Sequence, residues 1–316
     1  MKNKYKLIIF IVLVVLMFFG MALIGAKGKI SNLKYVFFGD QNHTLKTLTE
    51  TNSFIKLKIN IVDKNIEFIT SEEEEIKIEY YESEQYSFSH YFSDDTLGFY
   101  GERNFYFNFN FFNFNKSKYR TVKVYLPKGY SGAIEAITSN SKISISDYTL
   151  TSLDLESSNG KITVSNINTE KLELTTSNST ISLSNINVVN DLYCQTSNGK
   201  VLLNNISAED IEVITSNGAI EGSQFKATSI SFNTSNSPIN TTSIDCGDIL
   251  AVTSNSKVTL GIIGKMSDYK ISYETFNGNA KINDVNYANK NTLNNDAPKL
   301  LFIETSNAYI YVNFTE

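Results

Sequence analysis

Apolar and polar residues alternate along most of this chain, in phase with a recurring Thr-Ser-Asn phrase. Counted from each asparagine, apolar residues stand six and four positions before it and three, five and eight positions after it. The spacing of two within each group is the side-chain period of a β-strand and not of a helix. The column three positions after the asparagine consists of Ile143, Ile162, Ile181, Val201, Ile220, Ile239, Val258 and Ile310.

The asparagines follow one another in steps of 19, 19, 20, 19, 19, 19, 22 and 30 residues. A fixed period of this size is typical of stacked-repeat proteins. We expect each unit to be two short strands joined by a turn at the asparagine, with a second turn in polar stretches such as 166–171. The asparagines are Asn140, Asn159, Asn178, Asn198, Asn217, Asn236, Asn255, Asn307 and, in a Thr-Phe-Asn variant, Asn277.

A single unit cannot bury its apolar row, whereas units stacked about 4.7–4.9 Å apart can pair each strand with its copies above and below. Burial of an aliphatic side chain contributes roughly 1.5–3 kcal/mol, so a rung is stable only beside its neighbours. The pattern predicts an all-β, single-stranded β-solenoid, or β-helix, with right-handed winding. Its column eight positions after the asparagine should face inward: Ile167, Ile186, Ile206, Phe225, Ile244, Ile263 and Val285.

The residue after the asparagine is glycine in some repeats and serine in others, for example Gly160 and Ser141. Serine would be strained at positive φ, so we predict that the asparagine itself takes the left-handed conformation. Stacked asparagines are also expected to form a hydrogen-bonded structural turn ladder. The alternative is a comb of Asn, Ser and Thr side chains that binds sugars or ice.

These repeats, the alternating strands and an N-terminal apolar segment resemble the bacterial β-strand-repeat proteins labelled as adhesins. The resemblance covers roughly residues 31–316 and is strongest after Ser131. It implies a β-helical extracytoplasmic domain, found in some relatives beside cell-envelope stress systems. It implies no catalytic residues.

Residues 7–26 are an unbroken apolar or small stretch, preceded by Lys2, Lys4 and Lys6. Twenty helical residues at 1.5 Å each span about 30 Å, the thickness of a hydrocarbon core. We expect a cytoplasmic N-terminus and transmembrane anchor over 1–28, with the remainder extracytoplasmic by the positive-inside rule. The rival hypothesis is a cleaved signal peptide and a secreted protein.

Three further segments follow the anchor. Residues 29–52 are interpreted as a spacer, 53–130 as degenerate rungs with an aromatic cap, and 131–316 as the regular solenoid. In the first degenerate rung, Glu72 stands where the repeats have asparagine. Phenylalanines crowd one short stretch, and we predict that they cover the end of the stack or form an aromatic patch for a partner. These residues are Phe105, Phe107, Phe109, Phe112 and Phe114.

The longer steps predict insertions at 261–268 and 287–298, the second as a flexible loop. Two inward positions depart from the pattern, at Gly222 and Thr241, and the last strand, 309–314, is expected to close the stack.

Composition and motifs exclude several classes of function. A net charge of −5 argues against nucleic acid, and two cysteines exclude a disulfide scaffold. His43 and His90 lie in no metal or nucleophile motif, so we expect no cofactor, no metal and no catalytic residue. Glu156, Glu173 and Glu212 are interpreted as a solvated ladder of like charge.

The favoured function is a non-catalytic, membrane-anchored module that binds a cell-envelope protein or glycan. The alternatives are a glycan-processing enzyme of β-helix shape and a scaffold that polymerises end to end. An enzyme needs converging titratable groups in a cleft, whereas a polymer needs an open terminal rung.

Overall fold

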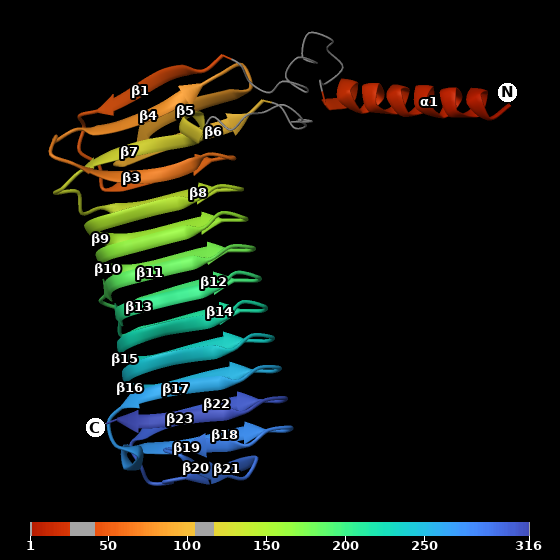
Figure 1. The fold of residues 1–316 in the computed structure, drawn as a ribbon. Helices are drawn as coiled ribbons and strands as arrows, with labels where there is room; N and C mark the ends of the chain where they lie inside the picture. The colour runs from red at the N-terminus through yellow and green to blue at the C-terminus, as the bar shows by residue number, and fades with distance from the viewer. Residues whose placement is uncertain (1, 26–41, 105–116, 316) are drawn as a thin grey trace.

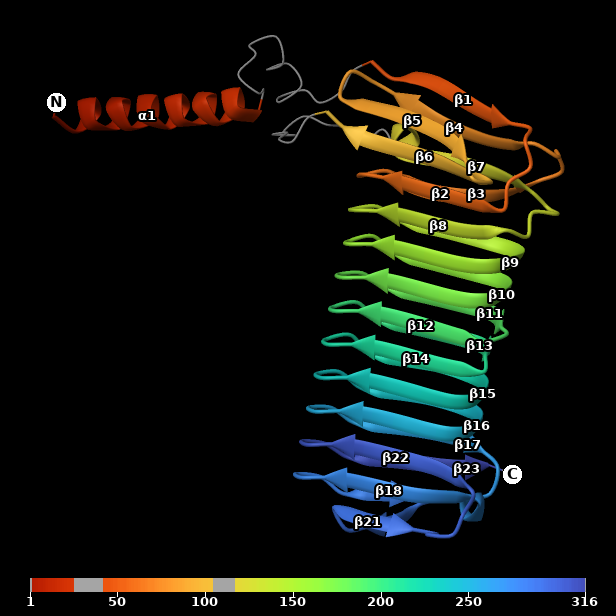
Figure 2. The same cartoon turned by 180° about the vertical axis from the view of Figure 1, so that it is seen from behind.

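The computed structural model describes residues 2–25, 42–104 and 117–315, as one α-helix, α1 (Lys2–Gly25), and a tall stack of strands (Figures 1 and 2). Short 3₁₀ helices occur at Ser117–Arg120 and Met266–Asp268. The strands are β1 Thr44–Glu50, β2 Lys56–Ile61, β3 Asn65–Ser71, β4 Ile76–Glu82, β5 Tyr86–Ser93, β6 Thr96–Arg103, β7 Thr121–Pro127, β8 Ala133–Thr138, β9 Ile143–Ser157, β10 Ile162–Thr176, β11 Ile181–Val188, β12 Asp191–Thr196, β13 Val201–Ser207, β14 Asp210–Thr215, β15 Ile220–Thr234, β16 Ile239–Thr253, β17 Val258–Ile263, β18 Tyr269–Thr275, β19 Ala280–Ile282, β20 Val285–Tyr287, β21 Lys290–Leu293, β22 Lys299–Thr305 and β23 Ile310–Thr315.

Successive repeats pair in parallel and in vertical register, as the 19-residue period predicts. Ile143, Ile162, Ile181 and Val201 are direct cross-strand neighbours, and each has 0% of its surface exposed. The aliphatic columns therefore lie inside one continuous core. All-β architecture is confirmed for the described chain.

Each rung has two arms, which we name arm A, before the Thr-Ser-Asn turn, and arm B, after it. Arm A stacks in the order β5, β6, β2, β8, the second halves of β9 and β10, β12, β14, the second halves of β15 and β16, β22, β18 and β21. Arm B stacks as β1, β4, β7, β3, the first halves of β9 and β10, β11, β13, the first halves of β15 and β16, β17, β23, β19 and β20.

In six successive rungs the left-handed residue lies at the second corner, and none of the Thr-Ser-Asn asparagines has positive φ, so the conformation predicted for them was wrong. One residue with φ between 52° and 68° forms that corner, seven positions after the asparagine, and in β9, β10, β15 and β16 the strand continues through it. A single left-handed residue turns the chain without breaking the ladder, so no loop is needed there. The column is Asp147, Asn166, Asn185, Asn205, Gln224 and Ser243.

The last strands do not close the stack. Strands β22 and β23 lie between the rung of β16 and β17 and the rung of β18 and β19, which precedes them in sequence (Figure 1). The end is formed instead by β20 and β21, which pair antiparallel with β19 and β18. The insertion over 287–298, predicted to be a flexible loop, thus contributes strand β21 as a cap.

The N-terminal strands are also inserted into the stack and do not lie at its end. Strands β2 and β3 lie between the rung of β6 and β7 and the regular repeats, while β4, β1 and β5 add antiparallel strands beyond them (Figure 2). In this register Ile61 lies beside Thr138, so Asp63 falls at the asparagine position, and the assignment of Glu72 to it was wrong. Both ends therefore insert a terminal segment beneath an antiparallel cap.

Two residues predicted to face inward do not. Ile263 is 43% exposed and Val285 is 53% exposed. The register of β17 shifts by one residue against β16, so that Ile262 takes the buried place beside Ile244. Val285 belongs to the short antiparallel cap strand β20 and not to a rung.

The inward glycine at 222 is explained by two aromatic rings in its own rung. Phe225 and Phe232 are buried and packed edge to face, with centroids 5.5 Å apart, where neighbouring rungs have aliphatic residues. A Cβ at position 222 would lie 2.7 Å from the Phe225 ring and 2.3 Å from the Leu203 carbonyl oxygen. The larger ring thus fills the space that the glycine leaves.

We therefore predict that Gly222→Ala and Phe225→Ile are coupled. Each change alone should destabilise the fold by about 1–3 kcal/mol, through overpacking or through a cavity. The double variant should lose roughly 1 kcal/mol less unfolding free energy than the sum of the two single losses. The reason is that the isoleucine side chain leaves part of the crowded space free for the new Cβ. Urea unfolding of the four chains tests this, and strict additivity would refute the packing explanation.

Among the helices of the described residues, none combines the length and apolarity needed to cross a membrane. The transmembrane anchor expected over 1–28 therefore finds no support here.

Candidate functional site: the turn ladder and the outer face of arm A

The predicted aromatic patch, Phe105 to Phe114, lies outside the described residues. Aromatic rings of the described residues also pack at the N-terminal end of the stack, within the antiparallel cap. Tyr80, Phe88 and Phe99 form a cluster with centroids 4.5–5.4 Å apart, joined by Tyr86.

The nine repeat asparagines form one column in which every amide is hydrogen-bonded to the next. Except in Asn140, each Nδ2 donates to the Oδ1 of the asparagine one rung nearer the N-terminal end, over 2.6–2.8 Å. The chain of bonds passes from Asn255 to Asn307 and then to Asn277, following the spatial order of the rungs. Bonds aligned in this way polarise one another and strengthen the row.

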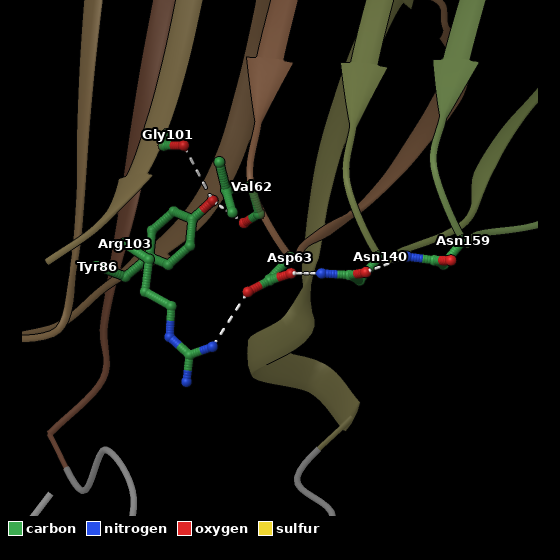
Figure 3. Close-up of polar contacts among 7 residues, drawn as sticks. All are labelled: Val62, Asp63, Tyr86, Gly101, Arg103, Asn140 and Asn159. Atoms are coloured by element: carbon green, nitrogen blue, oxygen red, sulfur yellow. Dashed lines mark hydrogen bonds and ion pairs between the residues drawn. The ribbon is translucent and has the colours of Figure 1, made fainter. Parts of the chain in front are cut away.

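The ladder ends on a carboxylate. Asn140 donates its amide hydrogen to Asp63, which also accepts from the Arg103 guanidinium at 3.1 Å (Figure 3). Beside it the Tyr86 hydroxyl donates to the Val62 carbonyl oxygen, and burial raises the pKa of that phenol well above its usual range. A carboxylate can only accept hydrogen bonds, so Asp63 suits the end toward which all the amides donate.

The threonine of the repeat has a separate role. Its hydroxyl is buried and donates to the carbonyl oxygen of the residue after the asparagine in the neighbouring rung, as Thr234 does to Gly218 at 3.1 Å. In three rungs the hydroxyl oxygen of this side chain also accepts a hydrogen bond from the glycine N–H of its own turn. The buried column is Thr138, Ser157, Thr176, Thr196, Thr215, Thr234, Thr253, Thr305 and Thr275. The phrase Thr-Ser-Asn is therefore explained by hydrogen bonding between rungs.

A shorter amide ladder follows the left-handed corner. Asn205, Asn185 and Asn166 donate in turn over 2.7–3.0 Å and end on Asp147. Hydrogen bonds from Ser146 and then Asn166 hold the pKa of the Asp147 carboxyl below its ordinary value. Both ladders thus end on an aspartate that accepts from the last amide, which supports a structural function for these columns.

Carboxylate side chains are concentrated on the outer face of arm A. Glu135, Asp154, Glu173 and Glu212 lie in one vertical column, interrupted only by Tyr193. Adjacent columns add further carboxylates, and we name the set the acidic band: Asp154, Glu156, Glu173, Asp191, Asp210 and Glu212. Of the three glutamates predicted to form a ladder of like charge, Glu173 and Glu212 lie in this column, and Glu156 lies in the next outward column of the same arm, beside Thr175.

Cations lie at one end of the band. Lys56 and Lys58 contact Glu135 at 2.9 and 3.0 Å. Partial burial opposes ionisation of Glu135, but the two ammonium groups outweigh it and lower its pKa. Further along, Lys171 contacts Glu173 at 3.3 Å.

Beyond the band, toward the C-terminal end of the stack, the same outer face becomes apolar. Leu250 and Phe302 are direct cross-strand neighbours there, and Leu300 is 41% exposed. We name Leu250, Val252, Leu300 and Phe302 the apolar patch. Arm B differs in the rungs of β9, β10 and β11, where its outer columns are hydroxyl-bearing: Ser144, Thr163, Ser182, Ser146, Ser165 and Ser184. Further along, the first of these columns continues with Leu202 and Glu221.

At the other end, Tyr91 lies flat on the sheet. Its ring stacks with Tyr100 at 5.6 Å, and a Cβ at Gly98 would lie 2.2 Å from it. An aromatic ring over a cross-strand glycine is a recurrent way to stabilise that glycine in a sheet. This pair therefore has a structural explanation.

Crowding of carboxylates affects Asp154 most. Partial desolvation, followed by the charges of Glu173, Glu135 and Glu156, raises its pKa. The folded chain therefore binds more protons than the unfolded chain between the two pKa values, so its stability falls as pH rises through that interval.

Asp154→Asn is accordingly expected to raise the urea midpoint near pH 7. At about pH 3, below the ordinary aspartate pKa, the variant and parent should agree, because both carry a neutral group there. Asp245→Asn, on arm B, controls for the loss of one charge. A lower midpoint for Asp154→Asn near pH 7 would contradict the assigned repulsion.

The acidic band surrounds a shallow, open hollow of about 590 Å³ lined by Glu173, Tyr193, Gln195 and Glu212. Small-molecule sites are usually enclosed and largely apolar, which this hollow is not. No group of three or more His, Cys, Asp or Glu side chains within the described residues is arranged to hold a metal ion. Cys194 and Cys246 are free and buried, and burial raises the pKa of both thiols.

Comparison with known proteins gives two matches. A family model described as Toastrack DUF4097 matches residues 54–295. A crystal structure described as a "putative cell adhesion protein" from Clostridium sporogenes is similar over 87% of this chain and 99% of its own, with 14% identity and a TM-score of 0.29. No curated protein matches the chain.

Proposed function

Since this chain belongs to the Toastrack DUF4097 family, we propose that it is a non-catalytic, adhesin-like binding module of the cell envelope. Its working surface is the outer face of arm A, where the acidic band adjoins the apolar patch. The single observation that supports this is the asymmetry of the two arms. In the rungs of β9 to β11, two sheets with the same inward pattern differ outside, since arm A carries carboxylates and arm B carries small hydroxyl groups.

The occupant that best fits this face is a protein surface that is basic and partly apolar. Lysine and arginine side chains on the partner would neutralise the repulsion within the acidic band, most of all at Asp154. Apolar side chains would cover Leu300 and Phe302, whose exposure in water is unfavourable. An anionic glycan would be repelled by the same carboxylates.

Tethering to the membrane is part of the proposal. The support is the sequence itself, in which twenty apolar or small residues follow three lysines. We expect an extracytoplasmic solenoid held at the membrane by residues 7–26. Carbonate extraction of membranes tests this, because an anchored chain stays in the pellet and a secreted chain does not.

Binding is tested with a defined probe, a synthetic amphipathic helix of lysine and leucine, added to the full-length chain in detergent. We expect Glu173→Lys with Glu212→Lys to weaken binding at least about tenfold, since close charge pairs are each worth a kcal/mol or more at an interface. Asp245→Lys is the matched control on arm B and should have little effect. Equal losses from the two faces would contradict the assignment.

The partner class is tested in cells with a photo-crosslinking residue at Tyr193, on arm A, or at Thr163, on arm B. The proposal predicts protein adducts from position 193 that disappear with the double lysine variant. Adducts from position 163 alone, or glycan adducts from position 193, would refute it.

One observation favours the alternative of a glycan-processing enzyme. Asp154, whose pKa is raised, stands beside Glu173 in register, and a pair of carboxylates is the machinery of glycosidases. Hydrolysis of purified cell-wall glycan that Asp154→Asn abolishes would establish it. The third hypothesis, end-to-end polymerisation, requires a ladder that a second copy can continue, and the antiparallel strands at both ends of the described stack interrupt it.

A further inference from the structure

Four repeat asparagines are followed by glycine, and the structure distinguishes one of them from the other three. The pairs are Asn159–Gly160, Asn198–Gly199, Asn217–Gly218 and Asn277–Gly278. Asparagine before glycine is the sequence in which the backbone nitrogen meets least hindrance when it attacks the side-chain carboxamide. In the first three pairs this nitrogen is occupied.

In these three pairs the glycine N–H donates a hydrogen bond to the buried hydroxyl of the same repeat. Gly160 donates to Ser157 at 2.9 Å, Gly199 to Thr196 at 3.1 Å and Gly218 to Thr215 at 3.0 Å. All three glycines are buried. Loss of the amide proton, which must precede attack, would cost a hydrogen bond in a place that water does not reach.

Gly278 lacks both protections. It is only partly buried, and its N–H forms no hydrogen bond within the described residues, although the Thr275 hydroxyl oxygen would lie 2.9 Å from a Cβ at this position. Asn277 is also the last member of the ladder in space, although Asn307 comes later in sequence.

The Asn277 side chain is also held less firmly. Inner members of the ladder donate through Nδ2 and accept through Oδ1, as Asn198 does between Asn178 and Asn217. Asn277 donates to Asn307 at 2.7 Å, but within the described residues nothing donates to its own Oδ1. It can therefore rotate toward the Gly278 nitrogen after losing one hydrogen bond instead of two.

From this contrast we propose that Asn277 is a site of spontaneous deamidation. The deprotonated Gly278 nitrogen attacks Cγ of Asn277, a C–N bond forms, and ammonia leaves to give a five-membered succinimide. Water then opens either carbonyl, giving aspartate or isoaspartate. The net reaction consumes one water and releases one ammonia.

The product places a carboxylate at the free end of the ladder. Asn307 loses the donor that Asn277 supplied, and a negative charge appears next to its Oδ1. The hydrogen bonds among the other eight asparagines are unchanged, so the stack persists while its end acquires charge.

The test incubates the intact chain at mildly alkaline pH in ¹⁸O-labelled water and maps the label by peptide mass spectrometry. We expect Asn277 to deamidate at least about tenfold faster than Asn159, Asn198 and Asn217, the factor that corresponds to about 1.4 kcal/mol of hydrogen bonding. In concentrated urea the four rates should converge. Equal rates in the folded chain, or a difference that persists in urea, would overturn the proposal.

Thr196→Val provides the matched variant, because it removes the acceptor from Gly199 and keeps the side-chain volume. Deamidation at Asn198 should rise, while Asn159 and Asn217 keep their slow rates. An unchanged rate at Asn198, or a rise shared by all three sites, would show that the hydrogen bond to the glycine nitrogen is not the protection.

Discussion

Ending the chain after Pro298 is expected to unfold the C-terminal part of the stack, although only the last 18 residues are lost. Strands β22 and β23 pair on both sides, with β16 and β17 and with β18 and β19. Their removal exposes two ladders and loses the burial of Leu301, Ile303, Ile310 and Val312. Burial of four aliphatic side chains contributes about 6–12 kcal/mol, comparable to the whole stability of an ordinary domain.

The matched control deletes one internal repeat, residues 162–180, which is a similar length of chain. Because the repeats before and after it are in register, Ile143 can pair with Ile181 after the deletion, and the shorter solenoid should fold. Hydrogen exchange should show protection in β16 to β19 after the internal deletion and its loss after the truncation. Full protection in the truncated chain would mean that β18 and β19 pair directly with β16 and β17, contrary to this prediction.

Gly218→Ala is expected to destabilise the chain by about 3 kcal/mol or more. A Cβ at this position would lie 1.5 Å from the Gly199 carbonyl oxygen, a contact with backbone that no side-chain rotation can relieve. The neighbouring rungs would have to separate, weakening the asparagine ladder and the core together.

Ser237→Ala is the control, because that position already carries a Cβ in the next rung of the same column. It removes a hydroxyl that donates to the Asn217 carbonyl oxygen at 2.7 Å, so a loss of about 0.5–1.5 kcal/mol is expected. Urea unfolding measures both variants. Equal effects would indicate that close approach of the backbones is not what the glycine provides.

The sequence was sufficient for the repeating part of the fold. Side-chain alternation and the 19-residue period predicted the inward columns, because a strand has only two faces and stacked copies share one register. Stacking also placed the asparagines above one another. The outer columns could have been found by the same arithmetic, since Asp154, Glu173 and Glu212 follow the repeat once Tyr193 is included.

The order of the end rungs could not be found in this way. The alternation of apolar and polar side chains in a strand such as β23 fits equally well beside β17, beside β19 or at the end of the stack. The choice depends on which strands the antiparallel caps already occupy, and that is a property of the assembled ends. Asp63 was missed for a related reason, because the first rung lacks the Thr-Ser-Asn phrase that aligns the others.

The prediction of positive φ for the Thr-Ser-Asn asparagines was wrong because the local preference of asparagine was not the deciding factor in the folded chain. Asparagine tolerates positive φ, but here its side chain is held by the ladder, and the left-handed residue lies at the opposite corner. That corner also favours Asn and Asp, with Asp147 and Asn166 among its members, so the propensity argument was sound and the position was wrong.

The most direct test of the spatial order is disulfide formation in a chain whose own cysteines are replaced, as Cys194→Val and Cys246→Ala. In the structure Tyr311 lies between Thr259 and Lys281, directly beside each of them. A disulfide requires Cα atoms about 4.4–6.8 Å apart, and strands two rungs apart are separated by roughly 9.5 Å. We predict that Thr259→Cys with Tyr311→Cys crosslinks under mild oxidation and that Thr259→Cys with Lys281→Cys does not. The reverse outcome would show that the rungs stack in sequence order, and it would contradict the inserted strands and the ladder that passes through Asn307.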